Sequence, residues 1–291
     1  MTDSAIAPLA SDAPWVVLKF GGTSVATAER WRTILQLASV RRAEGNRVLV
    51  VVSALSGITD ALKGLCACAE SERGAAVAKI VERHRALVAQ MQLDGVEGVE
   101  HWLASLQDLM HDAAPDRLVW QAAVQAHGEL LSSSLGAAFM SANGLATGWL
   151  DAREALHARE LPFLNERARI LSAQVLAEPD PALSARLATA GEVFITQGFI
   201  ARNADGETVL LGRGGSDTSA AYMGALLRAA RVEIWTDVAG MFTADPRQVP
   251  GARLLQRLDY DEAQEIASTG AKVLHPRCLS PCRRARVPLW I

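Results

Sequence analysis

A lysine that precedes two glycines and two hydroxyl residues is the first group in this sequence whose types and spacing could do chemistry. The group consists of Lys19, Phe20, Gly21, Gly22, Thr23 and Ser24. Glycines let main-chain N–H groups approach an anion closely, and the lysine ammonium adds a positive charge. A helix predicted from Val25, capped by Thr23 or Ser24, would point its positive end at the same place. The group fits either a phosphate site or a plain strand–turn–helix corner with a solvated lysine.

A second group joins glycines to an arginine, a hydroxyl and an acid. It consists of Gly212, Arg213, Gly214, Gly215, Ser216 and Asp217, and a helix is predicted after it over Thr218–Leu227. A guanidinium binds carboxylates and phosphates through paired N–H groups, and a helix N-terminus attracts anions. Asp217 could serve only as a stabilising charge at the helix start. The concentration of special residues in so short a stretch favours a binding site.

Two further candidates lie between these groups. A small-residue turn from Ser53 to Thr59 follows an apolar run and offers several hydroxyl groups. Glu129 interrupts an apolar helical pattern, so its carboxylate lies either on the surface or buried beside a cation. Because glutamate is rarely buried, the sequence alone favours the surface position.

The elements that must position these residues begin with a strand–helix–strand pattern. Val16–Leu18 and Val48–Val52 are apolar runs typical of strands buried on both faces, and a helix is predicted between them over Val25–Glu44. This order predicts a right-handed parallel unit, in which ligands bind at the carboxyl ends of the strands. The turns that follow the two strands should therefore lie side by side.

The rest of the chain is expected to supply a helical lobe and further strands. The lobe is predicted over residues 60–143, with breaks at Asp94-Gly95 and near Pro115. A turn signal at Asn203–Gly206 predicts that the segments on either side of it pair antiparallel. The strands are expected over 148–151, 193–200, 208–211, 232–235 and 287–291.

Composition and length describe an ordinary globular chain. It has 291 residues, 50% of them hydrophobic and 21% charged, with a formal net charge of -3. Neither this charge nor any apolar run indicates binding to nucleic acid or a membrane. Residues 1–14 lack the pattern of a signal peptide and are expected to form a disordered leader.

Cysteine spacing and nucleotide signatures narrow the chemistry further. The C-x-C pair Cys66 and Cys68 and the C-x-x-x-C pair Cys278 and Cys282 lack the usual zinc spacing, so we expect reduced thiols in a cytoplasmic protein. The sequence contains neither G-x-x-x-x-G-K-[ST] nor G-x-G-x-x-G. A nucleotide would have to bind through another architecture.

Seven short stretches, taken in order, closely resemble those of the aspartate kinases in the amino acid kinase superfamily. The resemblance runs from Trp15 to Ile291 and implies a three-layer αβα sandwich, an α/β fold with a central, mainly parallel sheet, as the catalytic domain over 15–291. The stretches are Lys19–Ser24, Ser53–Thr59, His127–Ser132, Arg213–Asp217, Trp235–Asp237, Thr243–Arg247 and Lys272–Pro276.

The resemblance implies ATP-dependent phosphorylation of the side-chain carboxylate of L-aspartate to 4-phospho-L-aspartate, with Mg²⁺. This reaction opens the biosynthesis of lysine, threonine, methionine and, in bacteria, diaminopimelate. Lys19 and Asp217 would be catalytic, with no side-chain metal ligands, and the full-length enzyme would be a homodimer or larger homo-oligomer. The substrate-binding residues would be Ser53, Thr59, Glu129, Arg213, Gly214, Gly215 and Ser216. The ATP-binding residues would be Lys19, Phe20, Gly21, Gly22, Thr236, Asp237, Phe242, Arg247, Lys272 and Val273.

The chemistry agrees with this set of residues. The carboxylate nucleophile has a reference pKa of about 3.9, so no general base is required. The protein must align two anions and neutralise the charge on the transferring phosphoryl group, which suits Lys19, Lys272 and Mg²⁺. Asp217 is expected to organise Lys19 and not to accept a proton.

The sequence departs from the family pattern in two places, and two alternatives stay open. Phe242 stands where the family has a tyrosine, so a ring contact could survive but a hydroxyl hydrogen bond could not. Family members usually continue beyond the position of Ile291 into two regulatory ACT domains, so this chain is expected to be the catalytic domain of a longer or bifunctional enzyme. The alternatives are another member of the superfamily, such as a glutamate or acetylglutamate kinase, and a non-catalytic amino-acid or nucleotide sensor. The presence of Lys19 and Asp217 argues against a sensor.

Overall fold

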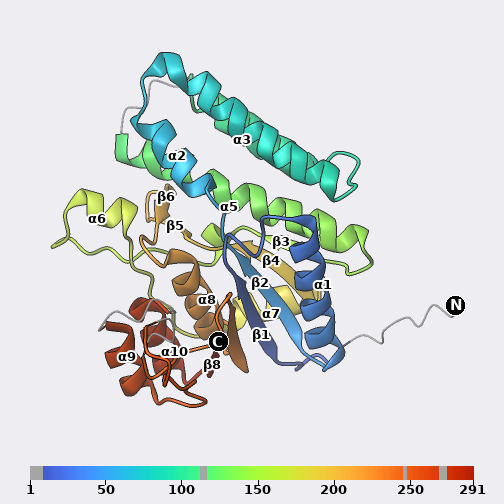
Figure 1. Ribbon diagram of the computed structural model, residues 1–291, viewed down its shortest axis with the longest axis vertical. Coiled ribbons are helices and arrows are strands. Elements are labelled where there is room, and N and C mark those ends of the chain that lie inside the picture. Colours follow the sequence, from blue (N-terminus) through green and yellow to red (C-terminus); the bar gives the residue numbers. More distant parts are fainter. Residues whose placement is uncertain (1–8, 112–116, 245–247, 269–273) are drawn as a thin grey trace, which may run out of the picture.

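The described residues form a six-stranded parallel sheet with helices on both of its faces (Figure 1). The computed structural model describes residues 9–111, 117–244, 248–268 and 274–291. The strand order is β3-β4-β2-β1-β7-β8, and all neighbours are parallel. The strands are β1 (Trp15–Phe20), β2 (Arg47–Val52), β3 (Gly148–Leu150), β4 (Val193–Gln197), β7 (Arg231–Trp235) and β8 (Leu289–Trp290).

The outer layers consist of helices that pack on opposite faces of this sheet. The helices are α1 (Ala28–Ala43), α2 (Ile58–Ala67), α3 (Glu70–Gln90), α4 (Glu97–Asp108), α5 (Arg117–Ala142), α6 (Glu166–Leu171), α7 (Pro181–Ala190), α8 (Gly215–Leu226), α9 (Tyr260–Ser268) and α10 (Leu279–Ala285). On one face, Val16, Leu18 and Val50 share a core with α1 to α5. On the other, Val17 and Leu49 share a core with α7, α8 and α10. The predicted αβα sandwich is confirmed.

Strands β1 and β2 lie in the middle of the sheet because they are apolar on both faces. All residues of β2 are buried, and in β1 only Lys19 is partly exposed. Lys19 stands opposite Val51 of β2 and Ile234 of β7. The carboxyl ends of three parallel strands therefore meet at the edge of the sheet where Lys19 lies.

The first helix begins later than the sequence indicates. Thr23 and Ser24 lie in turns and do not cap it. The N-cap is Thr27, whose hydroxyl accepts a hydrogen bond from the N–H of Arg30. A threonine near a helix start is a common cap, and this chain offers Thr27 as well as the two candidates favoured by the sequence. The predicted cap was wrong, and the extra residues lengthen the turn after β1.

The antiparallel pairing predicted for 193–200 with 208–211 is only partly correct. The expected strand is interrupted at Phe199, whose φ is +68°, a conformation that L-residues other than glycine seldom adopt. Its first part is β4, which pairs in parallel with β2 and β3 in the main sheet. Of the expected strand only its last residue, Ile200, belongs to β5 (Ile200–Arg202), which pairs antiparallel with β6 (Thr208–Leu210).

The segment predicted as helical contains α2, α3, α4 and α5. The expected break at Asp94-Gly95 lies between α3 and α4. The break near Pro115 falls outside the described residues. Figure 1 shows α2 and α3 on the far side of α5 from the sheet. The last strand is shorter than predicted, since β8 spans only Leu289–Trp290.

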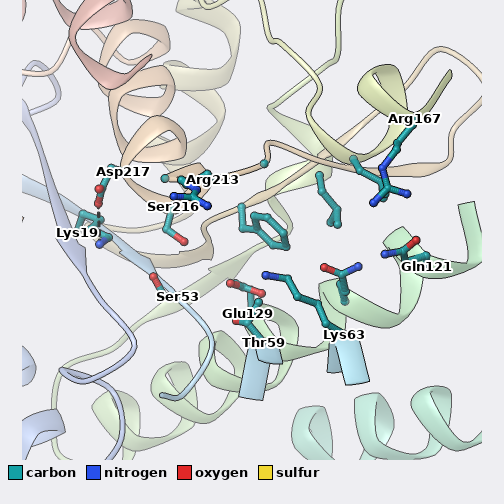
Figure 2. Close-up of a pocket in the computed structure, with 17 residues that line it drawn as sticks. Lys19, Ser53, Thr59, Lys63, Gln121, Glu129, Arg167, Arg213, Ser216 and Asp217 are labelled. Carbon is teal, nitrogen blue, oxygen red and sulfur yellow. Dashed lines mark ion pairs between the residues drawn. The ribbon is translucent and has the colours of Figure 1, made fainter. Parts of the chain in front are cut away.

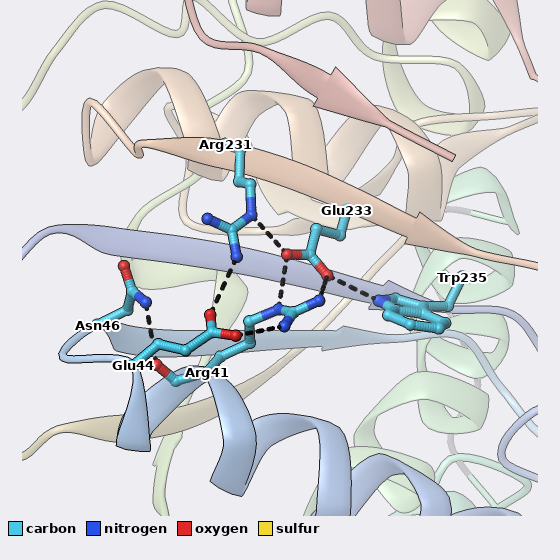
Figure 3. Close-up of polar contacts among 6 residues, drawn as sticks. All are labelled: Arg41, Glu44, Asn46, Arg231, Glu233 and Trp235. Carbon is cyan, nitrogen blue, oxygen red and sulfur yellow. Dashed lines mark hydrogen bonds and ion pairs between the residues drawn. The ribbon is translucent and has the colours of Figure 1, made fainter. Parts of the chain in front are cut away.

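A charge network fastens α1 to β7 on one face of the sheet (Figure 3). The Glu233 side chain on β7 is only 4% exposed, and Arg41 of α1 and Arg231 contact it at 2.8 and 2.6 Å. Trp235 Nε1 also donates to this carboxylate, at 3.1 Å. Two guanidinium groups thus compensate one buried carboxylate, which explains how an acid is tolerated inside a strand next to β1.

None of the described helices is both long and apolar enough to span a bilayer. The four cysteines are free thiols, and Cys66, Cys278 and Cys282 are buried. Within the described part of the chain, no three His, Cys, Asp or Glu side chains lie close enough together to hold a metal ion.

Candidate active site

A cavity of about 670 Å³ opens at the carboxyl edge of β1 and β2 (Figure 2). It brings together residues that the sequence places far apart. The lining residues that were predicted as site residues are Lys19, Ser53, Thr59, Glu129, Arg213, Gly214, Gly215, Ser216 and Asp217. All catalytic and substrate-side candidates therefore lie around one cavity.

Lys19 and Asp217 form an ion pair on one wall of this cavity. Lys19 Nζ lies 2.6 Å from Asp217 Oδ1, and the two side chains are 12% and 17% exposed. The ammonium also lies close to Gly21, since a Cβ placed there would be 3.5 Å from Nζ. The carboxylate thus holds the ammonium over the turn that follows β1, where an arriving anion would meet it.

The turns after β1 and β2 lie side by side, as predicted. Ser56 donates its N–H to the carbonyl of Gly22 at 3.1 Å. A Cβ on Gly22 would lie 2.7 Å from the carbonyl oxygen of Ala54, so only glycine fits there. Ser132 Oγ of α5 donates to the carbonyl of Ser53 at 2.8 Å and fixes the second turn.

Helix α8 points its N-terminus at the cavity. It begins at Gly215, three residues earlier than predicted, so Ser216 and Asp217 belong to its first turn. Gly214 is its N-cap in a left-handed conformation with φ of +66°, and no side chain caps the helix. The positive end of this helix and the cationic Arg213 make the surrounding wall suitable for an anion.

Glu129 is buried, which corrects the surface position favoured by the sequence. Its residue is 3% exposed, and Oε2 has no hydrogen-bond partner. Burial raises the pKa of Glu129 to about 8, although a hydrogen bond from the main chain of Ala54 and the charge of Lys63 act to lower it. A buried carboxylate with an open oxygen on a cavity wall is well suited to bind a cationic group.

Sequence reasoning missed four polar residues of the cavity: Lys63, Gln121, Gln125 and Arg167. Gln121, Gln125 and Glu129 are spaced four residues apart on α5, and Lys63 follows Thr59 by four on α2. Residues with this spacing share one face of a helix. The four-residue spacing is visible in the sequence. It identifies these residues as site residues only if one knows which face of α2 and of α5 meets the cavity.

Of the described residues that were predicted to bind ATP, only Lys19 lines this cavity. Thr236 and Asp237 are exposed directly after β7, where Thr236 Oγ1 donates to Asp237 Oδ1 at 3.2 Å. Phe20 stacks on Trp235 with ring centroids 6.3 Å apart, and Phe242 forms an antiparallel bridge with Leu254. Arg247, Lys272 and Val273 lie outside the described residues. Phe20, Gly21 and Gly22 thus lie at the carboxyl end of β1, and Thr236 and Asp237 lie at that of β7.

Known proteins resemble this chain over nearly its whole length. The aspartokinase of Chlamydia trachomatis is 35% identical over 278 residues, which cover 95% of this chain and 61% of that protein. Lysine-sensitive aspartokinase 3 of Escherichia coli is 36% identical over 291 residues, with shares of 95% and 61%. Bifunctional aspartokinase/homoserine dehydrogenase 2 of Arabidopsis thaliana is 36% identical, with shares of 95% and 31%. The chain spans less than two thirds of these relatives.

Solved structures and a family model agree with these relatives. E. coli aspartokinase III in complex with aspartate and ADP superposes with a TM-score of 0.81 at 33% identity, covering 94% of this chain and 60% of that one. Aspartate kinase of Clostridium acetobutylicum, with a TM-score of 0.73 at 22% identity over 94% of this chain and 59% of that one, shares the fold. The model described as amino acid kinase family matches residues 14–291. The chain therefore belongs to the amino acid kinase family, and over nearly its whole length it is similar to aspartokinases.

Proposed function

We propose that this protein transfers the γ-phosphoryl group of ATP to the side-chain carboxylate of L-aspartate and forms 4-phospho-L-aspartate. The observation that carries the proposal is the cavity itself, which has a buried carboxylate on one wall and cations on the others. An amino acid with two carboxylates and one ammonium matches that arrangement of charge. The similarity to an aspartokinase solved with aspartate and ADP supports the same substrate and nucleotide.

Three parts of aspartate would meet three parts of the cavity. The ammonium would bind Glu129, whose Oε2 has no other partner. The α-carboxylate would bind Arg213, and Ser53 and Thr59 would contribute hydroxyls to the substrate. The side-chain carboxylate would then reach toward Lys19 and the first turn of α8 with Gly214, Gly215 and Ser216.

Transfer of the phosphoryl group requires the acceptor carboxylate and the phosphoryl group to be aligned and their negative charge to be neutralised. The acceptor carboxylate is ionised at neutral pH, because its reference pKa is about 3.9, and it can attack without losing a proton. Lys19 would neutralise charge that develops on the phosphoryl oxygens, and the N–H groups at the start of α8 would add fixed dipoles. Asp217 would hold the ammonium of Lys19 in place through their 2.6 Å contact.

The nucleotide would bind at the carboxyl ends of β1 and β7. Gly21 and Gly22 would approach its phosphates, while Thr236, Asp237 and Phe242 would surround the rest of it, together with Arg247, Lys272 and Val273. Because no cluster of three metal-ligating side chains occurs among the described residues, Mg²⁺ would rest mainly on the phosphates. Asp217 would be the nearest carboxylate to hold it, and the ion would supply further neutralisation of phosphate charge.

The alternatives make different demands on the cavity. Acetylglutamate carries no ammonium, so it would leave the Glu129 carboxylate without a partner. Glutamate is longer by one methylene, which typically changes binding by only about 1–3 kcal/mol, so it must be tested directly. A sensor would bind aspartate or nucleotide without turnover.

Hydroxylamine trapping tests the proposal. The chain is incubated with MgATP and hydroxylamine, and hydroxamate is measured with L-aspartate, L-glutamate, acetylglutamate or no acceptor. Product with aspartate alone is expected. Product with a different acceptor would reassign the substrate, and calorimetric binding of aspartate and ATP without any product would favour the sensor.

We also propose that the protein works in the cytoplasm, as the reduced thiols suggest, and that the homo-oligomer expected from the resemblance forms in the full-length enzyme. Its product would enter amino-acid biosynthesis. Light scattering of the purified protein measures the oligomeric state.

A further inference from the structure

Lys63 is a cation beside the buried carboxylate of Glu129. Both residues line the same cavity, and Figure 2 shows the Lys63 side chain reaching toward Glu129. Lys63 follows Thr59 by one helical turn of α2, which brings it to the cavity face of the helix. Oε2 of Glu129 is buried and has no hydrogen-bond partner. We propose that Lys63 is a positioning residue that increases the ionised share of the Glu129 carboxylate in the empty site, ready for a substrate ammonium. The inference rests on the proposed function.

The other charged or titratable groups around the cavity are Lys19, Asp217, Arg213 and Arg167, and His127 lies on the same helix as Glu129. Lys19 of β1 is paired with Asp217 of α8. Arg213 lies beside Ser216 on the wall formed by the start of α8, and Arg167 of α6 lies on the side of Gln121 (Figure 2). His127, also on α5, uses Nδ1 on the carbonyl of Ala123 and Nε2 on Ser105 Oγ.

Lys63 itself is free to act on Glu129. Lys63 forms an ion pair with Asp60 at 4.0 Å, and the two side chains are 54% and 89% exposed, so this pair contributes little to stability. The charge of Lys63 lowers the pKa of Glu129, against the larger effect of burial, which raises it. A lysine has a long, flexible side chain, so its ammonium can withdraw into water when the substrate ammonium arrives.

The proposal makes Lys63 matter for substrate binding and not for phosphoryl transfer. Without this cation, a larger share of Glu129 carries a proton at neutral pH, and a protonated carboxyl binds an ammonium poorly. The expected loss in kcat/KM for aspartate is about threefold to tenfold at pH 7, since Lys63 is half exposed and its charge is partly screened. This loss in kcat/KM should shrink at pH values above the pKa that Glu129 has in a variant without Lys63. There the Glu129 carboxylate is ionised in both the variant and the unchanged protein.

Two measurements on the whole chain test this inference. The first is the midpoint of the ¹³C titration of the Glu129 carboxyl in glutamate-labelled protein, assigned by its absence in Glu129→Gln. The second is the pH profile of kcat and of kcat/KM for aspartate. In Lys63→Met the midpoint should rise and the acid limb of kcat/KM should move with it, while kcat changes little. Lys63→Arg should restore both values.

Arg167→Gln is the matched control, because it removes a different cation from the same cavity. It should leave the Glu129 midpoint where it is in the unchanged protein. An identical midpoint in Lys63→Met and the unchanged protein would overturn the inference, as would a KM effect of equal size at every pH. If the midpoint rises but the unchanged protein yields no hydroxamate with aspartate, the proposed function fails while the coupling of Lys63 to Glu129 stands.

Discussion

Lys19 is the residue whose loss should affect the chemical step most. Its ammonium is held by Asp217 close to Gly21 in the turn after β1, where the proposed reaction would develop charge on the phosphoryl group. We expect Lys19→Met to lower kcat by about a thousandfold or more with a small change in KM, because the interaction strengthens in the transition state. Steady-state kinetics with MgATP and aspartate measure both values.

Lys79→Met is a suitable control for Lys19→Met, since it removes an exposed lysine of α3. Its kcat should match that of the unchanged protein. A Lys19→Met variant with unchanged kcat and a native circular dichroism spectrum would contradict the role of Lys19.

Glu129 should make aspartate use depend on pH. Its pKa of about 8 means that this carboxylate, which we propose binds the substrate ammonium, is mostly protonated at neutral pH. kcat/KM for aspartate should therefore rise with pH up to about 8 and then level off, with about a tenfold deficit one pH unit below the midpoint. In Glu129→Gln the value should be low and should lose this rise. A profile of the unchanged protein that is flat between pH 6.5 and 9 would argue that Glu129 is ionised throughout.

The residues of the cavity could be predicted from the sequence better than their environments. Lys19, Arg213 and Asp217 were recognisable because glycines and hydroxyl residues surround them in the sequence. A charged residue in such a stretch is more typical of a binding site than of a structural turn. The burial of Glu129 could not be read from α5, because an acidic residue on an apolar helix looks the same whether another helix covers it or not. Lys63 was missed for the same reason.

At the scale of elements, the close approach of α5 to the turn after β2 should be sensitive to one added methyl group. A Cβ on Gly128 would lie 2.7 Å from the Cβ of Ala54 and 3.2 Å from Leu62 Cδ1. Gly128→Ala should lower the free energy of unfolding by about 1–3 kcal/mol through overpacking. It should also lower kcat/KM for aspartate, because it pushes Ala54 away from Glu129. Thermal unfolding and kinetics test both effects.

The matched control for this variant is Gly74→Ala in α3. Nothing lies within 4 Å of a Cβ at Gly74, so the change should stabilise the helix by up to about 1 kcal/mol. If Gly128→Ala and Gly74→Ala changed the free energy of unfolding equally, α5 would be able to shift away from Ala54 without loss of stability.

The elements themselves differ in how far the sequence predicts them. Strands β1 and β2 were predicted because short, valine-rich apolar runs are typical of strands buried on both faces. The break at Phe199 was not, since a positive φ at a phenylalanine leaves no mark on the apolar pattern of 193–200. The cap of α1 was misplaced because Thr23, Ser24 and Thr27 are equally good caps, and the length of the turn after β1 decides among them.

At the scale of the whole molecule, a buried histidine should make the fold sensitive to acid. His127 is 3% exposed, and burial lowers its pKa to about 4. An unfolded chain protonates this histidine near pH 6.5, whereas the folded protein does not until about pH 4, so stability is lost as the pH falls between these values. The expected contribution is about 3 kcal/mol by pH 4.

Urea unfolding of the unchanged protein and His127→Gln at pH 7, 6, 5 and 4 measures this contribution. The variant should lose less stability over the range than the unchanged protein. His111→Gln, which replaces an exposed histidine, should follow the unchanged protein. Parallel pH curves for all three proteins would assign the acid sensitivity to other groups.

The charge network between α1 and β7 also sets the order in which the protein can assemble during synthesis. Arg41 and Glu233 are 192 residues apart, and β1 pairs with β7 across a similar stretch of chain. On a ribosome, β1 and Arg41 leave the exit tunnel long before their partners are translated. Until β7 is released, one edge of the apolar strand β1 has no neighbouring strand, a state that favours association with other chains. The native sheet can close only after β7 has been released, so the nascent chain should depend on protection by chaperones for most of its translation.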